Sequence, residues 1–172
     1  MPPPLYTRIM DRLSSRMRSF RKWTFPLGLL PLCVYLALHR GQFSLLDNAD
    51  LIIHEAGHFL FSPFGDFVHL MGGSLMQVLF PLFLAGYFFR SGYWPGVQLF
   101  LCWLGQNLIN ISVYAADADT RSLRLLGGGR HDWFYLLRRV GWLDYAETIG
   151  YLLFGLALAV FLSSLALPLF RD

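Results

Sequence analysis

The composition of this 172-residue chain excludes an ordinary soluble domain. Hydrophobic residues make up 55% of it and charged residues only 15%, and its mean hydropathy is +0.46. Because soluble domains carry about 25% charged residues, the sequence predicts an integral membrane protein, of a length suited to one domain. The net charge of +3 says little by itself.

Basic residues gather in residues 1–23, before the first apolar run. There are six of them: Arg8, Arg12, Arg16, Arg18, Arg21 and Lys22. Such a segment could bind nucleic acid, but beside an apolar helix it is more typical of a cytoplasmic flank or of an interfacial helix on anionic lipid. We therefore expect membrane lipids as partners, and no nucleic acid.

Residues 24–172 are expected to form a single transmembrane domain. Apolar segments lie at 24–39, 67–89, 95–116 and 147–169, and the last three are long enough for a membrane-crossing helix of about 20 residues. A fifth segment, at 49–63, is short and either spans the membrane or is re-entrant. Basic-residue counts favour spanning, because the N-terminus and a polar loop at 117–146 then share the cytoplasmic side. The predicted fold is an all-α polytopic bundle of about five transmembrane helices.

The short segment contains a His-Glu-x-x-His pentad, formed by His54, Glu55 and His58. Histidines four residues apart lie on one face of a helix, where both imidazoles can bind Zn²⁺ at about 2.0–2.1 Å. Glu55 is then the predicted general base that activates a water molecule. Three ionisable side chains in an apolar segment are costly unless a function uses them, so we interpret the pentad as a metal site.

A catalytic zinc site has three protein ligands and an open water position, so one more ligand must come from another segment. The segment 95–116 carries Asn107, Asn110 and Tyr114 at spacings of three and four, and Asp117 follows at the same spacing. These residues fall on one helical stripe, and Asp117 at its end is the predicted third ligand. Asn107 and Asn110 either orient the substrate or form hydrogen bonds between helices.

His131 is the alternative third ligand. It lies in the sequence GGGRHDW, where the glycines are expected to form a turn that folds His131 and Asp132 back over the site. His131 could bind zinc or stabilise an oxyanion in the transition state, with Asp132 as an orienting residue. His39 and His69 look solitary, and we expect them in packing or at the membrane interface.

Two further features of the sequence concern packing. Gly72, Gly73 and Ser74 are small enough to let another helix approach the segment 67–89 closely. Cys33 and Cys102 lie in apolar segments, where Cys usually behaves as a small hydrophobe, and without CxxC spacing they need not be paired.

The chain resembles the intramembrane zinc metalloproteases of the site-2 protease type. In that family a helix with His-Glu-x-x-His is followed by a second helix, and a third then brings an Asn and, several residues later, an Asp. His54, Glu55 and His58 match the first motif, and Asn110 and Asp117 have the order and spacing of the second. The sequence SVYAADAD stands where the family has Leu-Asp-Gly.

This resemblance covers residues 49–119 and implies His54, His58 and Asp117 as zinc ligands, with Glu55 as general base. The sequences HEAGHFLFSPFG and GGGRHDW together also resemble a small group of bacterial membrane proteins with the same pentad. A bacterial inner membrane is therefore the expected location.

The expected function is that of a zinc-dependent membrane hydrolase. The leading hypothesis is a metalloprotease for intramembrane proteolysis, which cleaves a transmembrane or juxtamembrane peptide with Glu55 as general base. A hydrolase of lipid amides or esters would need the same residues. In a non-catalytic zinc-binding scaffold or sensor, four protein ligands would instead occupy all coordination positions of the zinc, for example His54, His58, Asp117 and His131.

Overall fold

The computed structural model describes residues 5–124 and 130–170, with side chains from residue 20 onward. The described residues form helices joined by turns, without a strand, which confirms the all-α class. The long helices are α1 (Leu5–Leu38), α2 (Leu45–Phe61), α3 (Asp66–Arg90), α4 (Trp94–Ala116), α5 (Asp132–Val140) and α6 (Ala146–Ala166). Short 3₁₀ turns follow at η1 (Ser62–Phe64), η3 (Leu143–Tyr145) and η4 (Leu167–Phe170). The glycines of the predicted turn at 127–129 lie outside the described residues.

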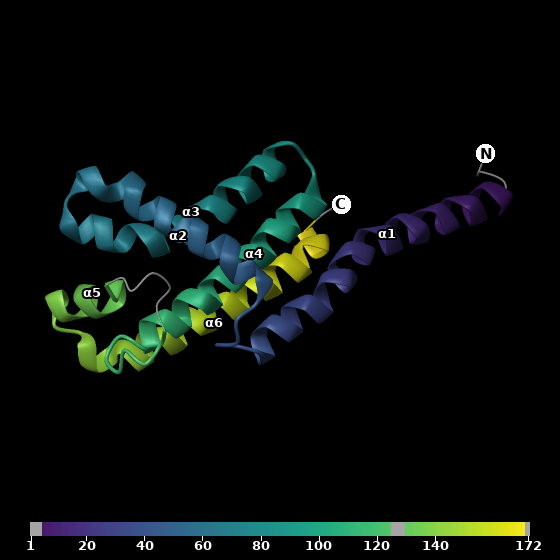
Figure 1. Ribbon diagram of the computed structural model, residues 1–172. Helices are drawn as coiled ribbons and strands as arrows, with labels where there is room; N and C mark the ends of the chain where they lie inside the picture. The colour runs from purple at the N-terminus through teal and green to yellow at the C-terminus, as the bar shows by residue number, and fades with distance from the viewer. Residues whose placement is uncertain (1–4, 125–129, 171–172) are drawn as a thin grey trace.

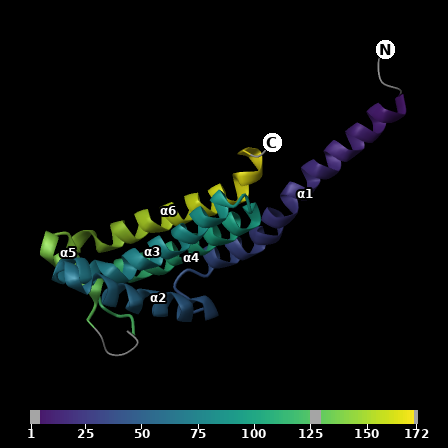
Figure 2. The ribbon, with the colours of Figure 1, turned by 90° about the horizontal axis from the view of Figure 1, so that it is seen from above.

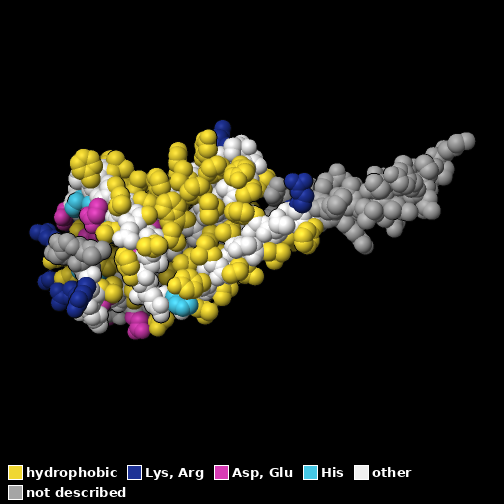
Figure 3. All heavy atoms as spheres, turned by 45° about the vertical axis from the view of Figure 1, so that its right-hand side comes forward, with side chains coloured by type: hydrophobic (Ala, Val, Ile, Leu, Met, Phe, Trp, Pro, Cys, Tyr) yellow, Lys and Arg dark blue, Asp and Glu magenta, His cyan; other side chains and the backbone are white. Residues whose placement is uncertain are grey.

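Three helical segments are long and apolar enough to cross a membrane: Asp66–Arg90, Trp94–Ala116 and Leu143–Phe170. Hydrophobic side chains cover much of the surface in Figure 3, as expected for a bundle surrounded by lipid. Three of the predicted apolar segments are thus confirmed as candidate spans. The predicted segment 24–39 forms the C-terminal part of α1, and a bundle of five spanning helices is not confirmed.

The core of the bundle is the packing of α4 against α6. Gly105 of α4 faces the ring of Phe161, and a Cβ atom at Gly105 would lie 2.4 Å from that ring. Gln98 donates from Nε2 to the Ser164 carbonyl oxygen at 3.0 Å, and the Ser164 hydroxyl donates back to the Gln98 carbonyl at 2.7 Å. Paired hydrogen bonds of this kind satisfy polar groups that lipid cannot.

The C-terminal half of α1 packs on this core. Cys33 and Cys102 are free, buried thiols whose sulfur atoms lie 3.4 Å apart between α1 and α4. Arg40, just after α1, donates from Nε to the Ser112 hydroxyl at 3.1 Å, and its guanidinium lies 4.9 Å from the ring centre of Phe154. These contacts fix the place from which α2 begins.

α2 and α3 form an antiparallel hairpin that is closed by glycine. Gly65 starts α3 with a φ of +93°, which favours glycine. Farther along, Gly57 and Gly72 meet so closely that a Cβ atom on Gly57 would lie 2.2 Å from the Gly72 carbonyl oxygen. The close approach predicted from the small residues of 67–89 is confirmed.

The two ends of the bundle are distinct. The start of α1, the turn between α3 and α4, and the C-terminus lie at one end, whereas α5 lies at the other (Figures 1 and 2). α2 begins beside the middle of α4, where the Trp103 indole donates to Asp50 at 2.9 Å. α2 starts halfway along α4 and is not among the three segments that are long and apolar enough to cross a membrane. The start of α1 and the helix α5 lie at opposite ends, whereas the five-helix expectation places residues 1–23 and 117–146 on one side.

Candidate metal centre

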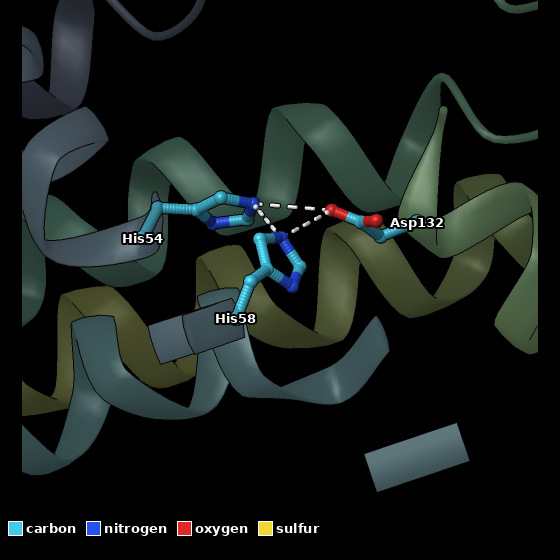
Figure 4. Close-up of side chains that lie close together, drawn as sticks. All are labelled: His54, His58 and Asp132. Carbon is cyan, nitrogen blue, oxygen red and sulfur yellow. Dashed lines mark hydrogen bonds and ion pairs between the residues drawn. The ribbon is translucent and has the colours of Figure 1, made fainter. Parts of the chain in front are cut away.

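Three side chains meet where the pentad faces the start of α5. His54 and His58 come from α2, and Asp132 is the first residue of α5. Nε2 of His54 lies 3.0 Å from Nε2 of His58, and each lies 3.1 Å from Oδ2 of Asp132 (Figure 4). The three atoms form a nearly equilateral triangle, and all three side chains are at most 14% exposed.

The hydrogen bonds behind the two imidazoles determine what these atoms can do. Nδ1 of His54 lies 2.9 Å from the Gln77 side-chain oxygen, and Nδ1 of His58 lies 2.7 Å from the His69 carbonyl oxygen. Because both partners only accept hydrogen bonds, each Nδ1 carries the proton and each neutral ring directs the lone pair of Nε2 inward. Two imidazole lone pairs and a carboxylate oxygen thus converge, and only a cation or an added proton can hold them together.

The size of the triangle suits a metal ion. For ligand distances of about 2.0–2.1 Å, an ion in contact with all three atoms would lie roughly 1 Å above their plane. These three side chains would supply three ligands to a metal ion, as in catalytic zinc sites that also bind water. Hydrogen bonds from ligand Nδ1 atoms to carbonyl oxygens are also the usual way in which metal-binding histidines are oriented. The residues therefore fit a metal ion.

Helix packing positions the first histidine. A Cβ atom at Gly73 would lie 2.4 to 2.6 Å from three atoms of the His54 ring. The imidazole therefore packs directly against the backbone of α3, which only a glycine at position 73 allows. His69 also returns a hydrogen bond from its Nδ1 to the His58 carbonyl at 2.9 Å. His69 is thus a partner of the pentad helix, and the prediction that it is solitary was wrong.

Two contacts place α5 and Asp132. The Trp133 indole donates to the Ser74 hydroxyl of α3 at 3.0 Å. The Tyr114 hydroxyl accepts from the Asp132 backbone N–H at 2.9 Å and donates to Oδ2 of Asp132 at 3.3 Å.

Asp117, the ligand expected from the sequence, lies outside the group of possible ligands that the described residues form. Its carboxylate accepts hydrogen bonds from Thr120, Ser122 and the Leu123 amide, and it pairs with Nε2 of His131 at 3.2 Å. Burial opposes ionisation here, but these hydrogen bonds lower the pKa of Asp117 to about 2. The carboxylate orders the connection between α4 and α5.

His131, the alternative ligand, is also outside this group. Its Nδ1 accepts from the Phe134 amide at 3.2 Å and so caps the N-terminus of α5. Asp117 and His131 therefore support the residue that follows them, Asp132. The structure brings to the histidines the residue that the sequence suggested only as an orienting group.

The remaining predicted site residues have different surroundings. Asn107 is wholly buried, donates to the Trp103 carbonyl of its own helix at 3.0 Å and does not line the cavity. Asn110 lines the cavity but donates to Asp47 at 2.9 Å. Glu55 is exposed on the cavity wall, next to His54 in sequence.

A cavity of about 610 Å³ opens beside the three converging side chains. Its walls come from α2, from Asp66–Gln77 of α3, from the Gln106–Tyr114 part of α4, from the end of α1 with the segment that joins it to α2, and from residues between α4 and α5. The volume lies within the range of about 300–1,000 Å³ that is usual for small-molecule sites. His54, Glu55, His58 and Asp132 all line it, so a molecule in the cavity can reach the metal position.

Sequence reasoning gave too little weight to three residues that support the site: Gln77, His69 and Tyr114. The signal for two of them was the close helix approach expected from Gly72, Gly73 and Ser74. With Gly57 against Gly72 in an antiparallel hairpin, His69 falls two residues from the position opposite His58, and Gln77 falls two residues from the position opposite His54.

No protein-family model matches the chain, and no curated protein or solved structure is significantly similar to it.

Proposed function

We propose that the protein is a zinc-dependent membrane hydrolase that cleaves a peptide bond in a transmembrane or juxtamembrane segment. The observation that carries this proposal is the convergence of His54, His58 and Asp132 beside Glu55 on the wall of one cavity. Two imidazoles and a carboxylate, with no thiolate, suit zinc in a catalytic site.

The chemistry is divided between the metal and Glu55. Zinc bound here would polarise the scissile carbonyl and make water a better nucleophile at neutral pH. Glu55 takes a proton from the attacking water, whose oxygen bonds to the carbonyl carbon. The C–N bond then breaks, and Glu55 passes the proton to the departing nitrogen.

The same three donors could hold Fe(II) in an oxygenase. The position of Glu55 favours hydrolysis, because a general base has to reach the water that a metal activates. The membrane that we propose is a bacterial inner membrane, with the basic residues 1–23 at its cytoplasmic face.

Metal content and cleavage should be measured on protein purified in detergent without chelator. We expect one equivalent of zinc in the wild type and in Glu55→Gln, and none in His54→Ala/His58→Ala. Cleavage of labelled single-span peptides should fall by about 10²- to 10⁴-fold in Glu55→Gln. Glu147→Gln is the matched control, since Glu147 is exposed at the start of α6, and it should keep both zinc and activity.

Several results would refute the proposal. Iron in place of zinc would indicate an oxygenase, and full activity of Glu55→Gln would remove the general base. Release of fatty acid from lipid extracts, without peptide cleavage, would change the substrate to a lipid amide or ester.

A further inference from the structure

The cavity extends from the metal centre along α2 to a second polar cluster. The cavity-lining residues of α2 are Asp47, Leu51, His54, Glu55 and His58, whose spacings place them on one helical face. With a rise of about 1.5 Å per residue, Asp47 and His54 lie about 10 Å apart along the helix. The cavity can therefore hold several residues of a chain whose reacting bond lies at His54.

Asp47 carries the charge at the far end. Its Oδ1 accepts hydrogen bonds from Gln106 at 3.1 Å and from Asn110 at 2.9 Å, and its Oδ2 accepts from the Ser44 backbone N–H. All three donors are neutral, and none of the four salt bridges among the described residues involves Asp47. The carboxylate is thus held in place without a cation to balance it.

Two buried oxygen atoms without a hydrogen-bond partner belong to residues next to Asp47: Gln106, which donates to it, and Asp50, which lies three residues along α2. Gln106, which lines the cavity, is only 4% exposed, and its Oε1 has no hydrogen-bond partner. Oδ2 of the wholly buried Asp50 also has none, although Asp50 does not line the cavity. Buried acceptors without a partner favour a donor or a cation in their neighbourhood.

The other parts of the cavity differ in character. Between its two polar ends the walls include the apolar side chains of Leu51, Ile109 and Val113. The arginines that line the cavity, Arg124 and Arg130, belong to the connection between α4 and α5. Glu55, Asp66 and Asp132 also line the part of the cavity away from Asp47, so the two arginines there have carboxylates in the same lining. At the Asp47 end, the charged side chain among the lining residues is Asp47 itself, and it attracts a positive group on a ligand.

We infer that Asp47 is a specificity-determining residue that binds a cationic side chain about three residues from the cleaved bond. An extended chain rises by about 3.3 Å per residue, so three residues cover the distance from His54 to Asp47, and apolar residues suit the part between. This inference rests on the proposed function, because it takes the ligand to be a peptide.

The test uses peptide binding rather than cleavage. The probes are labelled apolar peptides that carry a single lysine at successive positions, each with a norleucine analogue of the same length. Their Kd values are measured by fluorescence anisotropy on zinc-loaded Glu55→Gln protein in detergent. We expect one lysine position to bind about tenfold more tightly than its norleucine analogue, and wild-type protein to cleave that peptide about three residues from the lysine.

Variants connect this preference to Asp47. In Asp47→Asn, the ratio of the norleucine Kd to the lysine Kd should fall from about ten to about one. Asp119→Asn, an exposed residue outside the cavity lining, should keep the ratio. If Asp47→Asn fails to fold, the comparison of lysine with norleucine still decides the matter.

The outcomes separate the inference from the proposed function. Equal Kd values for lysine and norleucine at every position, or no binding at all, would overturn the inference even if the wild type cleaves peptides. A lysine preference that depends on Asp47, without cleavage by the wild type, would uphold the inference as a binding site and refute the hydrolase.

Discussion

At the residue scale, the site depends on which nitrogen of each histidine carries the proton. Gln77 and the His69 carbonyl take the Nδ1 protons, so both Nε2 atoms face Asp132 as acceptors. Three acceptors this close together repel one another unless a cation lies between them. Each ligand should therefore be more important for metal binding than the residues that support it.

The identity of the third ligand can be tested with two conservative variants. Asp132→Asn should abolish zinc retention through desalting, because it removes a ligand charge. Asp117→Asn should keep the metal with an affinity about 10- to 100-fold lower, as is typical of residues that orient a ligand. Competition with a zinc-sensitive dye measures both affinities, with exposed Asp144→Asn as control. The opposite order would restore Asp117 as the ligand.

Asp117 also gives a prediction on stability and pH. Its folded pKa of about 2 lies below the ordinary value of 3.8, so its contribution is fully present above pH 3.8 and is lost as pH falls through 2. At pH 6, with chelator present, Asp117→Asn should unfold more easily by about 1.5–3 kcal/mol. Thermal unfolding in detergent should show this difference shrinking toward zero near pH 2; a constant difference would contradict the charge argument.

At the scale of elements, the crossing of α2 and α3 decides where the pentad faces. Gly57 and Gly72 bring the helices into backbone contact, and Gly73 leaves room for the His54 ring. Larger residues would separate the helices and move both histidines away from α5. Metal binding and hairpin packing should therefore fail together.

Two glycines of this hairpin make a matched pair of variants. In Gly57→Ala the new methyl group meets the backbone of α3, and such overpacking costs about 1–3 kcal/mol. In Gly86→Ala the methyl group meets nothing within 4 Å, and alanine stabilises a helix by about 0.5–1 kcal/mol relative to glycine. Chemical denaturation in detergent should show a lower free energy of unfolding for Gly57→Ala but not for Gly86→Ala. Zinc content should likewise fall only in Gly57→Ala. Equal effects would show that the crossing is looser than described.

At the scale of the whole molecule, α3, α4 and the α6 segment could cross a membrane, and the candidate metal centre includes Asp132 at the start of α5. α2 joins the bundle halfway, beside Asp50 and Trp103. The start of α1 therefore comes to lie opposite α5, although basic-residue counts had placed residues 1–23 and 117–146 on one side.

Membrane topology distinguishes these two arrangements. In a variant without Cys33 and Cys102, an N-terminal epitope tag and the label on Asp119→Cys should be accessible from opposite sides. Ser91→Cys, in the turn between α3 and α4, should label from the side of the tag. Protease protection of the tag and an impermeant maleimide measure this in oriented vesicles. Access to the tag and to position 119 from one side would support the five-helix arrangement.

The sequence by itself determined the helical class, three of the apolar segments, and the pentad with its two inward-facing histidines. These follow from composition and from the helical period, which act over a few residues. Only the tertiary structure decided which carboxylate joins the two histidines in the candidate metal centre, and which residues support it. Asp117, His131 and Asp132 all had suitable chemistry, but the cap at His131 and the Tyr114 hydrogen bonds turn Asp132 toward the pentad. That choice depends on how α5 packs against α3 and α4, and no local pattern of residues encodes such a contact.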